Sequence, residues 1–170
     1  AVLSSGADCT IALAEYVSGS ESAFIELMNA KAEELGLKHS HFVNTSGLDA
    51  EGHYSCLSDI AVMMKYAMDI PFLATVFGTD KSLTSKTLQH PEGLTLESTT
   101  FARMGFNHLY GKMTIKGGKT GFTDDARHCL ATYAVDADGH PYIFVCAHAS
   151  TMYIPITDTS FVYGECVKTK

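Results

Sequence analysis

The stretch that decides the fold is Lys116-Gly117-Gly118-Lys119-Thr120-Gly121-Phe122-Thr123-Asp124-Asp125. Two runs of strand-like residues follow it, at 128–135 and 142–149. The linker between them, 136–141, is rich in turn-forming residues, so the two runs are predicted to form an antiparallel hairpin. Lys119-Thr120-Gly121 is therefore expected to begin the neighbouring strand of the same sheet.

Lys119-Thr120-Gly121 carries three groups that suit the capture of a peptide with a free carboxyl end. The lysine offers a positive charge and the threonine a hydroxyl donor for a carboxylate. The glycine has no side chain, so a second chain can approach the backbone and add as an extra strand. The tripeptide alone is a weak signal, because a solvated lysine at the start of a strand gives the same pattern.

Length and composition indicate a single globular domain that can bury a substantial core. The chain has 170 residues, of which 46% are hydrophobic and 18% are charged. The formal net charge is −7, from 12 basic and 19 acidic residues. Because no basic run stands out, the composition argues against nucleic acid or an anionic membrane surface as a partner. No apolar run approaches the ~18 residues that span a bilayer.

The five cysteines show no Cys-x-x-Cys spacing, so neither a disulfide framework nor a zinc site is expected. They are expected to be small buried hydrophobic residues. Their positions are Cys9, Cys56, Cys129, Cys146 and Cys166. The segment His39-Ser40-His41 places two imidazoles two residues apart, but no third ligand has a recognisable spacing. No metal site is predicted.

Two helices are predicted in the first 36 residues. Asp8 is expected to cap a short helix that ends at Gly19. Ser20 is expected to cap a second helix, because its hydroxyl can accept a hydrogen bond from the first turn. Gly36 lies where a left-handed residue usually ends a helix.

The middle of the chain predicts one more helix and a hairpin. Ser55 or Ser58 is expected to cap a helix that keeps one apolar face and ends before Pro71. Residues 83–88 and 94–100 alternate like strands around a turn-forming segment. A last amphipathic helix is expected from Pro155 and Asp158. Helices, then strands, then a helix indicate an α+β (α/β) fold with an antiparallel sheet and flanking helices.

Five segments of the chain carry a wider resemblance. They are Gly6-Ala7-Asp8 leading into Ala12-Leu13-Ala14-Glu15-Tyr16-Val17, Ala32-Glu33-Glu34-Leu35-Gly36-Leu37, His41-Phe42-Val43-Asn44-Thr45-Ser46-Gly47-Leu48, Gly52-His53-Tyr54-Ser55, and the Lys-Thr-Gly segment with Cys129-Leu130-Ala131 after it. In this order they resemble the penicillin-binding proteins, in particular the low-molecular-mass serine-type D-alanyl-D-alanine carboxypeptidases. Because ordered matches are far more specific than one motif, the chain is identified as a member of this family.

The resemblance implies a partial β-lactamase/transpeptidase-like fold with an active site built from three elements. The first is a Ser-x-x-Lys turn, whose serine attacks the penultimate D-alanine carbonyl and whose lysine takes its proton. The second is a Ser-x-Asn loop that relays protons and orients the substrate amide. The third is the Lys-Thr-Gly strand, beside donors for the developing oxyanion.

Carried over to this chain, Ser5 matches the serine of the second element and Lys119 the lysine of the third, and both are expected to be catalytic. Thr120 is expected to hydrogen-bond the substrate carboxylate and Gly121 to admit the substrate backbone. The backbone N–H of Phe122 is expected to form half of the oxyanion hole. The alternative for Ser5 is an ordinary serine that precedes a helix.

The chain departs from the family pattern in three respects. Ala7 stands where the family usually has Asn, so one hydrogen bond to the substrate amide is missing. Arg127 stands where the family often has a small residue. No serine is followed by a lysine three residues later. The nucleophile is therefore expected to lie before Ala1. Residues 1–170 are expected to form a single, N-terminally incomplete domain that does not acylate alone.

The leading hypothesis is a penicillin-binding carboxypeptidase that removes terminal D-alanine from peptidoglycan stem peptides through an acyl-serine. The resemblance implies an extracytoplasmic location in the cell envelope, β-lactam antibiotics as further ligands, and no cofactor. Two alternatives stay open: a β-lactamase-like hydrolase, for which no deacylating loop is recognisable, and a non-catalytic peptidoglycan-binding module. A membrane anchor outside residues 1–170 and self-association of the chain are left open as well.

Overall fold

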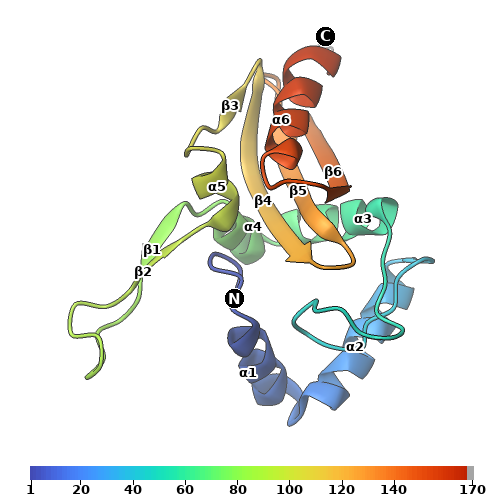
Figure 1. The fold of residues 1–170 in the computed structure, drawn as a ribbon, viewed down its shortest axis with the longest axis vertical. Coiled ribbons are helices and arrows are strands. Elements are labelled where there is room, and N and C mark those ends of the chain that lie inside the picture. Colours follow the sequence, from blue (N-terminus) through green and yellow to red (C-terminus); the bar gives the residue numbers. More distant parts are fainter. Residues whose placement is uncertain (168–170) are drawn as a thin grey trace.

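A four-stranded antiparallel sheet lies at the centre of the computed structural model, which describes residues 1–167 (Figure 1). Its strands, in spatial order, are β3 (Leu109–Tyr110), β4 (Met113–Thr123), β5 (Arg127–Val135) and β6 (Pro141–Ala149). Strands β5 and β6 form the hairpin that the sequence predicts at 128–135 and 142–149, and that prediction is confirmed.

Strand β4 begins earlier than the sequence indicates. Lys119-Thr120-Gly121 lies in its second half rather than at its start, so that prediction was wrong. Gly117 and Gly118 do not interrupt the strand, although a bulge precedes Gly117. A Cβ atom at Gly117 would lie 3.0 Å from Met68 Sδ, and one at Gly118 would lie 2.7 Å from Thr100 Cγ2. The glycine pair therefore lets two helices approach the strand closely.

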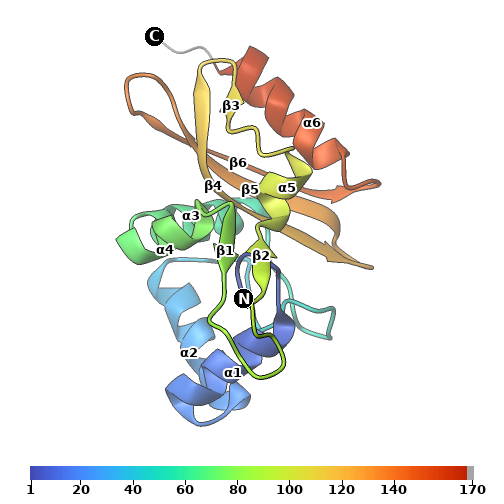
Figure 2. The ribbon, with the colours of Figure 1, turned by 90° about the vertical axis from the view of Figure 1, so that its left-hand side faces the viewer.

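Helices cover both faces of the sheet (Figure 2). On one face, α3 (Leu57–Met68) packs on β5 and β6, and α4 (Pro71–Phe77) packs on β4. On the other face lie α5 (Thr99–Arg103) and α6 (Ile154–Phe161), which continues into a π-helical turn, η1 (Val162–Cys166). The main core cluster lies on this second face and consists of Phe101, Met104, Met113, Ile115, Ala134 and Tyr163. This arrangement confirms the predicted α+β class.

Helices α1 (Ala7–Ser18) and α2 (Glu21–Glu34) pack against each other to one side of the sheet (Figure 1). The hydroxyl of Ser20 accepts a hydrogen bond from the backbone N–H of Ala23 at 3.2 Å, which confirms the predicted cap of α2. Gly36 has φ +73°, the left-handed conformation predicted for the residue after this helix.

Two predicted helix caps were wrong. Gly6, not Asp8, is the residue before α1, and Asp8 lies inside the first turn. A carboxylate in a first turn favours a helix through the dipole, so it gives a similar sequence signal without capping. Cys56, rather than Ser55 or Ser58, precedes α3 and makes no side-chain cap bond.

The predicted strands at 83–88 and 94–100 are shorter than expected. Only β1 (Lys81–Leu83) and β2 (Thr95–Glu97) pair, as a two-stranded hairpin that projects from the sheet (Figure 2). The hydroxyl of Ser98 accepts a hydrogen bond from the first turn of α5, so the chain changes from strand to helix at this residue.

The five cysteines are free thiols, as expected, but none is fully buried. Cys9 and Cys166 are exposed and the other three are half-buried, so the prediction of buried positions was wrong. Within residues 1–167, no single helix has the length and apolar composition of a membrane span. Helices α3 and α4 meet both criteria only when taken together, across a bend of 112°.

Candidate active site

Lys119 and Ser5 are in direct contact although 114 residues separate them in the sequence. The Lys119 ammonium donates a hydrogen bond to Ser5 Oγ at 2.5 Å and another to the carbonyl oxygen of Thr120 at 2.6 Å. Ser5 has φ +55°, in the left-handed region that serine seldom adopts. The structure thus brings together the two residues that the resemblance assigns to catalysis.

Thr99, the first residue of α5, forms hydrogen bonds to the segment that carries Ser5 and to the residue that follows Lys119. The backbone N–H of Thr99 donates to the carbonyl of Leu3 at 3.0 Å, which fixes the segment that carries Ser5. The hydroxyl of Thr99 lies 2.7 Å from the hydroxyl of Thr120. Thr120 is buried, so its hydroxyl is held by Thr99 rather than pointing freely into solvent. Sequence reasoning missed Thr99, because a threonine at a helix start carries no functional signal of its own.

The site carries an excess of positive charge. Burial lowers the pKa of Lys119, and the nearby positive charge of Arg103 lowers that pKa further. Within residues 1–167, neither side chain forms an ion pair with a carboxylate. Because the chain as a whole is acidic, this local excess of positive charge favours an anionic ligand.

The second half of β4 is open to an added strand. Strand β3 pairs only with Met113 and Thr114, so the segment from Gly117 to Thr123 pairs with β5 and with no other described strand. A Cβ atom at Gly121 would meet nothing closer than Cys129 Cβ at 3.6 Å. The fold itself therefore does not require a glycine at this position.

Phe122 ends the Lys-Thr-Gly segment beside a second aromatic ring. Its side chain is half-exposed, and its ring centroid lies 4.5 Å from that of His128 on β5. Pairing with His128 across the ladder fixes the backbone of Phe122. The expected role of its N–H in an oxyanion hole remains a prediction.

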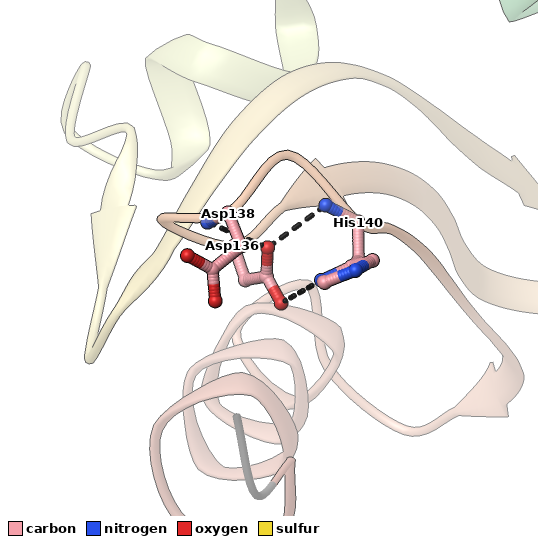
Figure 3. A group of neighbouring side chains, drawn as sticks. All are labelled: Asp136, Asp138 and His140. Carbon is pink, nitrogen blue, oxygen red and sulfur yellow. Dashed lines mark hydrogen bonds and ion pairs between the residues drawn. The ribbon is translucent and has the colours of Figure 1, made fainter. Parts of the chain in front are cut away.

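Asp136, Asp138 and His140 form a group of potential metal ligands in the β5–β6 turn (Figure 3). The Asp136 carboxylate is almost fully buried and already accepts hydrogen bonds from the backbone N–H groups of Asp138 and His140. It also contacts the His140 ring at 3.0 Å and the Tyr142 hydroxyl at 3.3 Å. These four contacts give the buried Asp136 carboxylate a structural role in the turn. His39 and His41, for which the sequence analysis predicted no metal site, are not part of such a group within residues 1–167.

Asp49 contacts the turn that follows the Lys-Thr-Gly segment, and the sequence did not reveal this contact. Its Oδ2 accepts a hydrogen bond from the backbone N–H of Asp125 at 3.1 Å, in the turn between β4 and β5. The two residues are 76 positions apart. The Asn, Gly and Asp content around Asp49 predicts a structured loop but does not indicate its partner.

The profile of the D-alanyl-D-alanine carboxypeptidases, peptidase family S11, matches residues 1–151 of the chain. The chain belongs to this family. The identification from ordered motifs is thus confirmed. The matched residues include both the Ser5 segment and the Lys-Thr-Gly strand.

Two curated members of the family illustrate the extent of the match. D-alanyl-D-alanine carboxypeptidase DacF of Bacillus subtilis is 35% identical over 133 residues, which are 78% of this chain and 32% of that protein. D-alanyl-D-alanine carboxypeptidase DacD of Escherichia coli is 35% identical over 137 residues, 79% of this chain and 32% of that protein. The chain therefore spans about a third of the length of these carboxypeptidases.

Solved structures confirm the transpeptidase-like fold. The Streptomyces K15 DD-transpeptidase superposes with a TM-score of 0.82 at 24% identity, over 98% of this chain and 65% of that one. Penicillin-binding protein 5 of Haemophilus influenzae gives a TM-score of 0.79 at 25% identity, over 95% of this chain and 44% of that one.

Proposed function

We propose that this chain is part of a serine-type D,D-carboxypeptidase that removes the terminal D-alanine from peptidoglycan stem peptides. The observation that supports this function best is the contact between Ser5 and Lys119 beside the open edge of β4. Residues 1–170 contain no Ser-x-x-Lys sequence, so the proposal requires a nucleophilic serine from outside these residues.

In the proposed reaction the substrate peptide adds to β4 as an extra strand, over Gly121. The ammonium of Lys119 binds its terminal carboxylate, which the surplus positive charge favours. The nucleophilic serine attacks the penultimate D-alanine carbonyl while the backbone N–H of Phe122 donates to the oxyanion. The hydroxyl of Ser5 relays the proton that the nucleophilic serine loses to the leaving D-alanine nitrogen, the C–N bond breaks, and water then hydrolyses the acyl-serine.

The same site supports β-lactam binding, since these antibiotics present a carboxylate next to an acyl carbon that a serine can attack. A substrate in peptidoglycan implies an extracytoplasmic location. Self-association and a membrane anchor outside residues 1–170 stay predictions.

The second candidate function is a non-catalytic peptidoglycan-binding module. Ala7 cannot hydrogen-bond a substrate amide, and the hydroxyl of Thr120 is already engaged by Thr99. The missing amide contact at Ala7 and the absence of a Ser-x-x-Lys sequence from residues 1–170 favour binding without turnover, whereas the contact of Thr120 with Thr99 does not separate the two functions. A β-lactamase-like hydrolase would need a deacylating carboxylate, and no observation on the described residues favours it.

Labelling of the protein produced from its gene with a fluorescent penicillin separates these functions. A carboxypeptidase is expected to keep a covalent label that survives denaturing electrophoresis. A β-lactamase would acquire the label and release it quickly. Absence of any covalent label would contradict the proposed enzyme and favour the binding module.

A further inference from the structure

The loop that carries Asp49 has a fixed shape. Backbone hydrogen bonds between His41 and Tyr54, at 2.9 and 3.0 Å, close its base. Inside the loop, the Asn44 side chain accepts from the N–H of Gly47 at 2.7 Å and donates to the carbonyl of Leu48 at 2.9 Å. These bonds hold the loop from 41 to 54 as one unit.

The same loop is attached to the helical part of the molecule. The Glu21 carboxylate, in the first turn of α2, accepts hydrogen bonds from the N–H and the hydroxyl of Thr45 at 2.9 and 2.8 Å. Because α2 packs against α1, which begins two residues after Ser5, the loop and Ser5 belong to the same part of the fold.

The Asp49 carboxylate connects this part to the turn that follows the Lys-Thr-Gly segment. It accepts the N–H of Asp125 at 3.1 Å and interacts with the hydroxyl of Thr123 and the N–H of Asp124. Thr123 Oγ1 in turn accepts the N–H of Ala126 at 3.0 Å. The exposed carboxylate of Asp49 thus contacts the turn between β4 and β5, which is also closed by its own hydrogen bond.

We infer that Asp49 is a positioning residue, whose carboxylate joins the 41–54 loop to the β4–β5 turn and so holds Ser5 in register with Lys119. This inference rests on the proposed function. Displacement of catalytic groups by about 1 Å can cost about a hundredfold in rate, so a connection at the end of β4 affects chemistry without touching the substrate.

The ionisation of Asp49 supports this role. The hydrogen bond from Thr123 lowers its pKa, burial opposes this effect, and the N–H groups of Asp125 and Asp124 lower the pKa further. A positive charge on His53 also favours the ionised carboxylate, whereas Asp124 and Asp125 contact it through their backbone N–H groups. A lowered pKa means that the connection is intact above about pH 4 and is lost as pH falls through the folded-state pKa.

The test compares Asp49→Ala, Asp49→Asn and Glu51→Gln in the protein produced from its gene. Asparagine keeps an acceptor oxygen but does not titrate, and Glu51 is an exposed acid on the same loop that serves as the charge control. Acylation by fluorescent penicillin is measured against pH. Amide hydrogen exchange is measured on peptides that cover 42–53 and 123–127.

We expect Asp49→Ala to acylate about tenfold more slowly at neutral pH and to exchange faster in both peptides. Asp49→Asn should acylate at a rate close to that of the wild type, and its rate should fall less at acid pH. Glu51→Gln should match the wild type. An unchanged acylation rate in Asp49→Ala overturns the inference while the proposed function stands. A wild-type protein that is never acylated instead refutes the proposed function.

Discussion

Gly118 lies so close to Thr100 that the fold leaves no room for a side chain between them. A Cβ atom at Gly118 would be 2.7 Å from Thr100 Cγ2 and 3.1 Å from the carbonyl oxygen of Ala131. Three residues along the same strand, a Cβ atom at Gly121 would meet nothing closer than 3.6 Å. One glycine of β4 is thus required by packing, while the other is not.

Gly118→Ala is expected to destabilise the fold, because α5 and β4 must separate to admit the methyl group. The expected loss is about 1–3 kcal/mol in the free energy of unfolding. Urea denaturation followed by circular dichroism measures it. A variant as stable as the wild type would show that α5 can move away without cost.

Gly121→Ala is the matched variant and is expected to keep the stability of the wild type within about 0.5 kcal/mol. In the proposed reaction, however, the substrate backbone passes over this residue, and the methyl group would hinder its approach. We therefore expect acylation by fluorescent penicillin to fall by about tenfold or more, because the acyl carbon is displaced from its productive position. Wild-type acylation would mean that no ligand approaches this glycine.

Lys119→Ala is expected to slow acylation about a hundredfold, because it removes the positive charge that faces Ser5. Lys116→Ala removes an exposed charge from the same strand and serves as the control, with a rate close to that of the wild type. Stopped-flow quenching with a fluorescent penicillin gives both rates. Equal rates for the two variants would exclude Lys119 from the site.

Arg127→Gly is expected to stabilise the protein by about 0.5–1 kcal/mol. Arg127 has φ +57° at the end of the β4–β5 turn, a left-handed conformation that costs a side-chain-bearing residue energy and that glycine adopts freely. Arg127→Ala removes the guanidinium but keeps a side chain in the left-handed conformation. It therefore distinguishes the effect of backbone strain from the effect of losing the guanidinium. Thermal unfolding of the three proteins tests this, and equal gains for alanine and glycine would contradict the strain argument.

Asp136→Asn is expected to lower stability at neutral pH and to flatten its dependence on pH. Burial opposes ionisation of Asp136, but hydrogen bonds from His140 and Asp138 outweigh it and lower the pKa. The ionised carboxylate therefore stabilises the fold above about pH 4, and this contribution is lost as pH falls through the folded-state pKa. Melting temperatures between about pH 3 and pH 7 measure the effect, with the exposed Asp138→Asn as control. An asparagine variant with the wild-type pH profile would disprove this account.

Local patterns in the sequence predicted much of the sheet and its helices. The β5–β6 hairpin, the Ser20 cap and the left-handed Gly36 all follow from preferences that act over a few residues. The same patterns misplaced the start of β4, because a glycine pair such as Gly117-Gly118 usually interrupts a strand. Here the pair allows close packing against Met68 and Thr100, which are distant in the sequence. The cysteines were misassigned for a similar reason, since composition does not tell which face of an element is covered.

The sequence by itself determined the family, through ordered motifs, and identified Ser5 and Lys119 as partners by resemblance. Only the tertiary structure decided that their side chains meet, that Thr99 holds the hydroxyl of Thr120, and that Asp49 reaches the turn after Phe122. These contacts join residues 114, 21 and 76 positions apart. Their geometry depends on how helices pack against the sheet, which no preference acting over a few residues encodes.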